Sequence, residues 1–265
     1  MNQYQTLMPI KTKGELPPLF CVHGEPLRMA MRIKADRPIY GLSHIYHSSF
    51  QESVADSIEI LASQYLEDVY KVCPKGPYYL LGFSAGSMVA FEMARQLMAG
   101  GKKVEYLVMV EPSIGKREKI NTKKTDAMKD YIQTVGWTPK SINYLIYRAY
   151  KSLISRTFTL SKRIYVSLLL SMGKDLPENL RWLGYLRALG PAINKYKYNS
   201  INCRATLIYR DMDQDGRDMV HSMWSEILGP EVEIEFSEGA AGHNDFMEDP
   251  HLSNLILLLD NRIMK

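Results

Sequence analysis

Residues 78–86 read Tyr78-Tyr79-Leu80-Leu81-Gly82-Phe83-Ser84-Ala85-Gly86, and this stretch decides the fold class. Its last five residues match the pattern G-x-S-x-G, in which a sharp turn between a strand and a helix exposes a serine hydroxyl. The two glycines are needed because the turn brings backbone close to backbone, where a Cβ would clash. The motif makes Ser84 a candidate nucleophile.

The residues on either side of the motif support this interpretation. An apolar strand candidate precedes Gly82, and residues 87–97 carry apolar side chains at helical spacing. The alternative is a glycine-rich loop between a strand and a helix that contains a serine by chance.

The composition indicates a folded protein without a disulfide framework or a metal site. With 265 residues, 46% of them hydrophobic, the chain can bury a full core. A net charge of +4 does not by itself indicate nucleic-acid binding. Cys21, Cys73 and Cys203 are far apart and have no histidine at ligand spacing, so we expect neither disulfides nor zinc.

The sequence contains no candidate signal peptide or membrane span. Residues 1–16 lack an apolar core beside their charges, and the apolar residues 164–172 are too few to cross a bilayer. We therefore expect a soluble cytoplasmic protein with no stable membrane insertion.

Strand and helix candidates alternate along most of the chain. Such alternation predicts an α/β fold with a mostly parallel sheet flanked by helices. The predicted strands are residues 19–22, 38–42, 77–82, 104–110, 203–209 and 232–236, and the predicted helices are residues 53–72, 87–97, 219–228 and 252–259.

The alternation stops in the middle of the chain. Residues 115–200 contain no strand candidate, only helical patterns such as residues 143–154 and 178–189. We expect one domain over residues 1–265, with residues 115–200 inserted as a helical lid over the strand ends.

A serine nucleophile needs a base, and His243 is the best candidate for it. It lies in a glycine-containing loop after the last strand, and it follows the serine and the acid, as the chain order of the motif's triad requires. We expect the other histidines in polar or helical surroundings, namely His44, His47, His221 and His251, to be solvated.

Two residues compete for the role of the acid that orients the base. Glu111 directly follows the apolar strand 104–110, where its carboxylate would be costly without a partner. Asp211 ends the next strand, although Asp211 and Asp213 also suit a turn. We favour Glu111 and keep Asp211 as the alternative.

An oxyanion hole needs two backbone N–H donors. Ala85, the residue after the nucleophile, would supply one donor at the positive end of the helix. The other would come from the loop His23-Gly24-Glu25-Pro26; because Pro26 has no N–H, Gly24 or Glu25 must donate, and we choose Glu25. His23 is then expected to order this loop.

With these residues in place, the chain resembles the thioesterase domains that end nonribosomal peptide and polyketide assembly lines. The resemblance covers nearly the whole length. Its landmarks are residues 19–24, 38–42, 76–78, 81–86 and 89–94, and Gly242-His243 followed by Phe246-Met247 and Pro250.

The resemblance implies an α/β-hydrolase fold with a helical lid. It also implies an acyl-enzyme mechanism on a thioester carried by the phosphopantetheine arm of a partner, so that the chain itself needs no cofactor and no metal. The family's acid commonly follows the strand after the motif's helix, the position of Glu111. Because the chain begins with Met1 and has no carrier domain, we expect a stand-alone enzyme.

Three positions depart from the family's pattern. Aspartate is usual where this chain has Glu111, which keeps Asp211 open as the acid. The oxyanion loop has His-Gly-Glu-Pro in place of His-Pro followed by small residues. Gly242 stands where aspartate is frequent.

Basic residues gather in the predicted lid. Residues 116–163 contain twelve Lys or Arg against three acidic residues. Such a surface could attract an acidic carrier protein, and an ordinary solvated helix face is the alternative. No nucleic-acid recognition motif accompanies the charge. The basic residues nearest the fourth strand, which we expect to meet the carrier, are Lys116, Arg117, Lys119, Lys123 and Lys124.

These features lead to one hypothesis and two rivals. The hypothesis is a serine thioesterase that releases an acyl, polyketide or peptidyl chain by hydrolysis or cyclisation. The rivals are a carboxylesterase or lipase acting on small esters, and a catalytically silent α/β-hydrolase that serves as a binding module.

Overall fold

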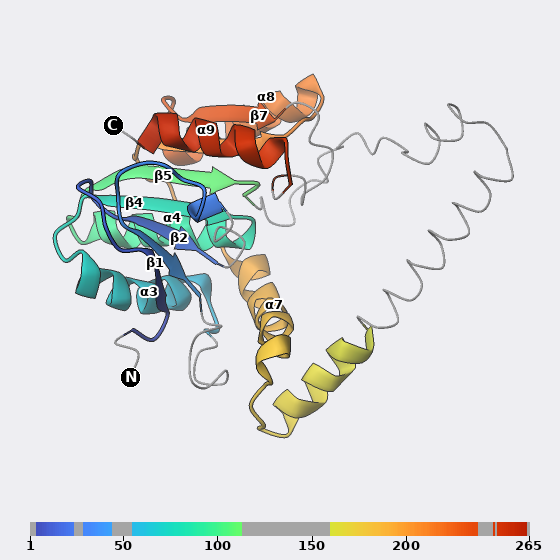
Figure 1. Ribbon diagram of the computed structural model, residues 1–265. Coiled ribbons are helices and arrows are strands. Elements are labelled where there is room, and N and C mark those ends of the chain that lie inside the picture. Colours follow the sequence, from blue (N-terminus) through green and yellow to red (C-terminus); the bar gives the residue numbers. More distant parts are fainter. Residues whose placement is uncertain are drawn as a thin grey trace, which may run out of the picture.

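In the described part of the chain, seven strands form one sheet at the centre of the fold (Figure 1). The computed structural model describes residues 4–23, 29–43, 55–112, 160–237, 246 and 248–263. The strands are β1 (Leu7–Lys11), β2 (Leu19–Val22), β3 (Ile39–Leu42), β4 (Tyr78–Phe83), β5 (Val104–Val110), β6 (Ala205–Arg210) and β7 (Glu233–Ser237). Their order across the sheet is β1-β3-β2-β4-β5-β6-β7.

All strand pairs are parallel except β1 with β3. The central strands β2 and β4 are buried along their whole length, which explains why their sequences are almost entirely apolar. Their register pairs Val22 with Gly82, and the next strand pairs Val110 with Phe83. The carboxyl ends of β2, β4 and β5 therefore meet at one edge of the sheet.

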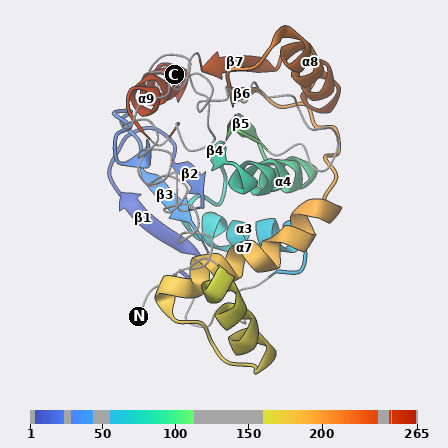
Figure 2. The same ribbon diagram turned by 90° about the vertical axis from the view of Figure 1, so that its right-hand side faces the viewer.

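Helices cover both faces of the sheet (Figure 2). On one face lie α3 (Ile58–Val72), α4 (Ala85–Ala99) and α8 (Gln214–Leu228), whose apolar side chains join the larger core cluster. On the other face α9 (His251–Ile263) packs with residues 29–35 in a second cluster. This is the layered arrangement expected for a parallel sheet.

In the described part of the predicted lid, residues 160–200, two helical stretches stand before β6. One covers residues 160–171 and the other is α7 (Glu178–Lys195), which contacts α3. Figure 1 shows both beside the sheet, with α7 the nearer to it. The face of α7 against the body carries buried side chains at helical spacing, namely Leu180, Tyr185, Leu189 and Ala192, followed by Tyr196 just past its end.

The predicted α/β-hydrolase architecture is confirmed, with differences in detail. The strands expected at residues 19–22 and 104–110 have those bounds in the structure. The antiparallel edge strand β1 was not predicted. The helix expected to end at residue 189 continues past Pro191 to Lys195, because Ala192 and Tyr196 are buried against the body. The helix expected at residues 143–154 lies outside the described residues.

Within the described ranges, none of the helices has the length and apolar character that a bilayer span requires.

Candidate active site

Ser84 occupies a strained turn between β4 and α4. Its φ of 54° lies in the left-handed region, which non-glycine residues seldom adopt. The turn is held by the Ser84 N–H, which donates to the Val110 carbonyl of β5 at 2.8 Å. Ser84 is the N-cap residue of α4, but its hydroxyl makes no capping hydrogen bond to that helix. The residue is half-buried, and its hydroxyl is not committed to capping, as a nucleophile elbow requires.

Both glycines of the motif are needed for the close approach of β4 and α4. A Cβ on Gly82 would lie 2.4 Å from the Gly86 carbonyl oxygen and 2.5 Å from the Ser87 Cα. A Cβ on Gly86 would lie 2.6 Å from the Val22 carbonyl oxygen. All of these neighbours are backbone atoms, so a side chain here would displace the strand or the helix.

We expect Gly82→Ala to lower the free energy of unfolding by more than about 3 kcal/mol, because the new methyl group would meet backbone at under 3 Å. Gly100→Ala is the matched control: it ends α4 with a φ of −83°, and the nearest atoms to a new Cβ lie at an ordinary 3.5 Å. We expect this control to change the free energy of unfolding by less than about 1 kcal/mol, because alanine fits this backbone without strain. Urea unfolding of both variants measures the difference, and equal stabilities would contradict the packing argument.

Glu111 directly follows β5 and carries a buried carboxylate. Only 7% of the residue is exposed, and its φ of 49° is again left-handed. Its Oε1 accepts the backbone N–H of Arg210 at 2.7 Å, and its Oε2 lies 3.8 Å from the Arg210 Nε. A buried, hydrogen-bonded carboxylate in a fixed orientation is suited to orient a neighbouring base.

Asp211 has different surroundings. Its side chain is 47% exposed and pairs with the Arg217 Nη2 at 2.8 Å. Asp213, two residues on, caps α8 by accepting the Gly216 N–H at 3.0 Å. Both aspartates therefore have surface or capping contacts that account for them, whereas the Glu111 carboxylate is buried.

Strained backbone gathers at this edge of the sheet. Among the described residues, three non-glycine residues have a positive φ, namely His23, Ser84 and Glu111. Each is the first residue after a strand, β2, β4 and β5 respectively, and these strands are neighbours in the sheet. Strained residues persist only where the surroundings hold them, and they cluster at functional sites.

Of the other predicted site residues, Ala85 lies in the described part of the chain. Ala85 is the first residue of α4, where backbone N–H groups have no partner inside the helix. His243, Glu25 and the basic residues at 116–124 lie outside the described residues. The segment that carries His243 follows Ser237, which is paired with Arg210 at the carboxyl ends of β7 and β6. Phe246, beyond it, is buried under α9.

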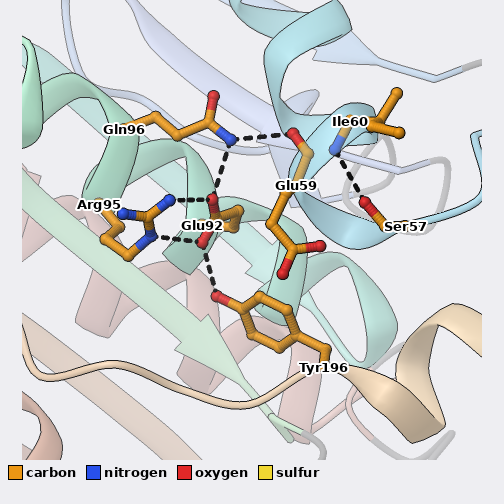
Figure 3. A network of polar contacts seen from close by, with 7 residues as sticks. All are labelled: Ser57, Glu59, Ile60, Glu92, Arg95, Gln96 and Tyr196. Atoms are coloured by element: carbon orange, nitrogen blue, oxygen red, sulfur yellow. Dashed lines mark hydrogen bonds and ion pairs between the residues drawn. The ribbon is translucent and has the colours of Figure 1, made fainter.

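Glu92 is a buried carboxylate that sequence reasoning did not single out (Figure 3). It lies on α4 and accepts hydrogen bonds from Arg95, Gln96 and the Tyr196 hydroxyl at 2.7–2.9 Å. Burial opposes its ionisation, but these hydrogen bonds and the charge of Arg95 outweigh burial and lower its pKa. Gln96 also donates to the Glu59 carbonyl of α3. The network thus joins α3, α4 and the end of α7.

The described part of the chain shows neither a reactive thiol nor a cluster of metal-ligating side chains. Burial raises the pKa of both Cys21 and Cys203 to about 12, so these thiols stay protonated near neutral pH. No group of three or more His, Cys, Asp or Glu side chains gathers there in a way that could hold a metal ion.

Comparison with known proteins identifies related sequences. A family profile described as "Thioesterase domain" matches residues 27–260. A dimodular nonribosomal peptide synthase of Bacillus subtilis (strain 168) is 38% identical over 111 residues, 40% of this chain. Malpinin synthetase of Mortierella alpina is 29% identical over 167 residues, 57% of this chain. The chain spans only 5% and 2% of the length of these two relatives.

Solved structures share the fold. The NocB thioesterase domain, in covalent complex with a fluorophosphonate nocardicin G analogue, has a TM-score of 0.60 at 20% identity, with 97% of this chain and 98% of that one covered. The type II thioesterase BorB, from the borrelidin biosynthetic cluster, has a TM-score of 0.61 at 16% identity, with 99% and 98% covered.

Proposed function

Because this chain belongs to the thioesterase domain family, we propose that it is a serine thioesterase that releases an acyl, polyketide or peptidyl chain from a phosphopantetheinyl carrier protein. The family implies hydrolase activity, and the related synthases imply release of an acyl chain. The observation that carries the proposal is the strained Ser84 turn beside the buried carboxylate of Glu111 on the neighbouring strand.

The proposed reaction has two covalent steps. The Ser84 oxygen attacks the thioester carbonyl while His243 takes the hydroxyl proton, and the proton then passes to the departing phosphopantetheine sulfur. In the second step water, or a hydroxyl or amine of the acyl chain itself, attacks acyl-Ser84 and restores the serine. Water gives a free acid, and an internal nucleophile gives a ring.

The remaining groups orient the base or stabilise charge. Glu111 holds His243 in the orientation that receives the serine proton and stabilises the imidazolium. The amides of Ala85 and Glu25 hold the oxyanion, and the positive end of α4 favours the same charge. The chain needs no metal or cofactor of its own, since the phosphopantetheine arm belongs to the partner.

The experiment that tests this function compares two substrates at equal concentration. One is an acyl group on a phosphopantetheinylated carrier protein, and the other is a p-nitrophenyl ester of the same acyl group. Faster turnover of the carrier-bound thioester supports the proposal. Turnover of the ester alone would indicate a carboxylesterase, and turnover of neither would indicate a silent binding module.

We also propose where the carrier meets the lid. Helical residues 160–171, with the turn that follows, expose an apolar row at every fourth position, namely Leu160, Ile164, Leu168 and Met172. The basic residues Lys162, Arg163 and Lys174 lie in the same segment, which contains no acidic residue. An acidic partner with an apolar contact surface fits such a face, since opposite charges steer the encounter.

Arg163→Glu is therefore expected to raise KM for the carrier-bound thioester by about fivefold at low salt, because it reverses an exposed charge at the contact. The same acyl group on free pantetheine should react unchanged, and the effect should weaken at high salt. Lys75→Glu, an exposed residue in the turn before β4, is the matched control and should not change KM. An unchanged KM in Arg163→Glu would exclude docking at this face.

A further inference from the structure

We propose that Tyr185, on the lid helix α7, is a positioning residue that acts through His23 on the oxyanion site. The proposal rests on the function proposed above, because it concerns the groups that would hold the oxyanion. It goes further in linking the position of the lid to the chemistry at Ser84.

His23 is buried at the point where β2 ends. The residue is 4% exposed, it has a left-handed φ of 75°, and its N–H donates to the Leu42 carbonyl at 2.7 Å. The chain continues directly from His23 to Gly24 and Glu25, the segment proposed to supply the second oxyanion donor. His23 is therefore two residues from the proposed donor Glu25 in the sequence.

The His23 ring also lies against the first turn of α4. A Cβ on Gly86 would be 3.1 Å from the His23 Nδ1 and 2.6 Å from the Val22 carbonyl oxygen. Gly86 follows Ala85, whose N–H is the other proposed donor. His23 is thus adjacent to both halves of the proposed oxyanion hole.

Tyr185 holds this ring from the lid. Its hydroxyl is hydrogen-bonded to the His23 Nε2, and its ring stands nearly perpendicular to the imidazole with centroids 5.1 Å apart. Tyr65 of α3 also presents its ring to the imidazole, at 6.2 Å. Tyr185 is itself 4% exposed, so the link is shielded from water.

A second tyrosine of the lid makes a comparable contact far from the oxyanion site. Tyr196 lies three helical turns beyond Tyr185 and donates its hydroxyl proton to Glu92 at 2.9 Å. Glu92 is two turns along α4 from Ser84. The two contacts anchor the same helix to the body, but only Tyr185 reaches a residue next to the proposed donors.

We therefore expect the Tyr185 and Tyr196 hydroxyls to affect catalysis differently. If α7 moves so that the Tyr185–His23 bond breaks, the imidazole loses a hydrogen-bond partner that helps to fix its orientation beside the first turn of α4. Oxyanion contacts strengthen as charge develops in the transition state, so their loss lowers kcat and leaves KM largely unchanged.

The test compares Tyr185→Phe with Tyr196→Phe, two changes that each remove one buried hydroxyl and keep the ring. We expect Tyr185→Phe to lower kcat for pantetheine-bound acyl substrate about tenfold at unchanged KM, a smaller effect than loss of a direct oxyanion donor. Tyr196→Phe should keep kcat within twofold while lowering the melting temperature. A kcat for Tyr185→Phe within twofold of the wild type, or an equal loss in both variants, would overturn the proposal.

A second measurement separates this proposal from the proposed function. The ¹⁵N signal of the His23 Nε2 reports the hydrogen bond whether or not the protein turns over a thioester. It should shift in Tyr185→Phe and stay in place in Tyr196→Phe, and no shift in either would refute the link. Suppose that Ser84 of the wild type is never acylated but the His23 signal shifts in Tyr185→Phe. The proposed thioesterase function and the catalytic effect of Tyr185 would then be refuted, whereas the Tyr185–His23 hydrogen bond would be supported.

Discussion

Ser84→Ala is expected to lower kcat for release of the carrier-bound chain by at least about 10⁴-fold, because the proposed acyl-enzyme forms on the Ser84 oxygen. The substitution removes one oxygen from a half-buried side chain whose hydroxyl makes no capping bond to α4. Folding should therefore be little affected. Release of the phosphopantetheine thiol, followed with a thiol reagent under saturating substrate, measures the loss.

Ser87→Ala is the matched control, since Ser87 lies one turn away on the same helix. Its hydroxyl is fully buried and donates to the Gly82 and Val110 carbonyls at 2.8 and 3.1 Å. Losing these hydrogen bonds should cost about 1–2 kcal/mol of stability and leave the nucleophile in place. Activity of Ser84→Ala within tenfold of the wild type would show that Ser84 is not the nucleophile.

Glu111→Gln is expected to lower kcat by about 10³- to 10⁴-fold. Glutamine keeps the size of the side chain and an oxygen that can accept the Arg210 N–H, but it loses the charge that stabilises a protonated base. The loss should appear in kcat, measured with the same thiol-release assay, because the carboxylate acts on the transition state rather than on substrate binding.

Asp211→Asn is the comparison that decides the acid. This side chain is half exposed and paired with Arg217, and such surface pairs contribute less than about 1 kcal/mol to stability. We expect kcat within twofold of the wild type. A large loss in Asp211→Asn together with a small one in Glu111→Gln would transfer the acid role to Asp211.

The sequence predicted those elements whose conformation depends mainly on residues close together in the chain. Gly82 of the elbow is required by backbone contacts with Gly86 and Ser87, four and five residues away, so the local sequence predicts this part of the turn. Gly86 is required by the Val22 carbonyl of the distant strand β2, and only the motif indicated it. The strand β5 is buried along most of its length, so its apolar run predicts its bounds. Glu111 could be singled out as the candidate acid because it directly follows that strand, where a charged side chain needs a partner.

Contacts between distant parts of the chain could not be predicted in this way. In the edge strand β1, Pro9 interrupts the apolar residues Leu7, Met8 and Ile10, and the pairing with β3 defines it as a strand. The Tyr185–His23 bond joins residues 162 positions apart, and the Glu92–Tyr196 bond joins residues 104 apart. Each tyrosine looks like an ordinary apolar position of a lid helix in the sequence. His243 and Glu25 remain predictions from chain order and loop chemistry.

The most direct test of the central claim is the mass of the enzyme during turnover. The wild type is mixed with an acyl-loaded carrier protein, quenched in acid and digested, and the peptide that contains residues 82–86 is measured. We predict that this peptide gains the mass of the acyl group, with the modification on Ser84, and that the Ser84→Ala enzyme shows no such gain. Turnover without an acyl group on Ser84, or an equal gain in Ser84→Ala, would contradict the account.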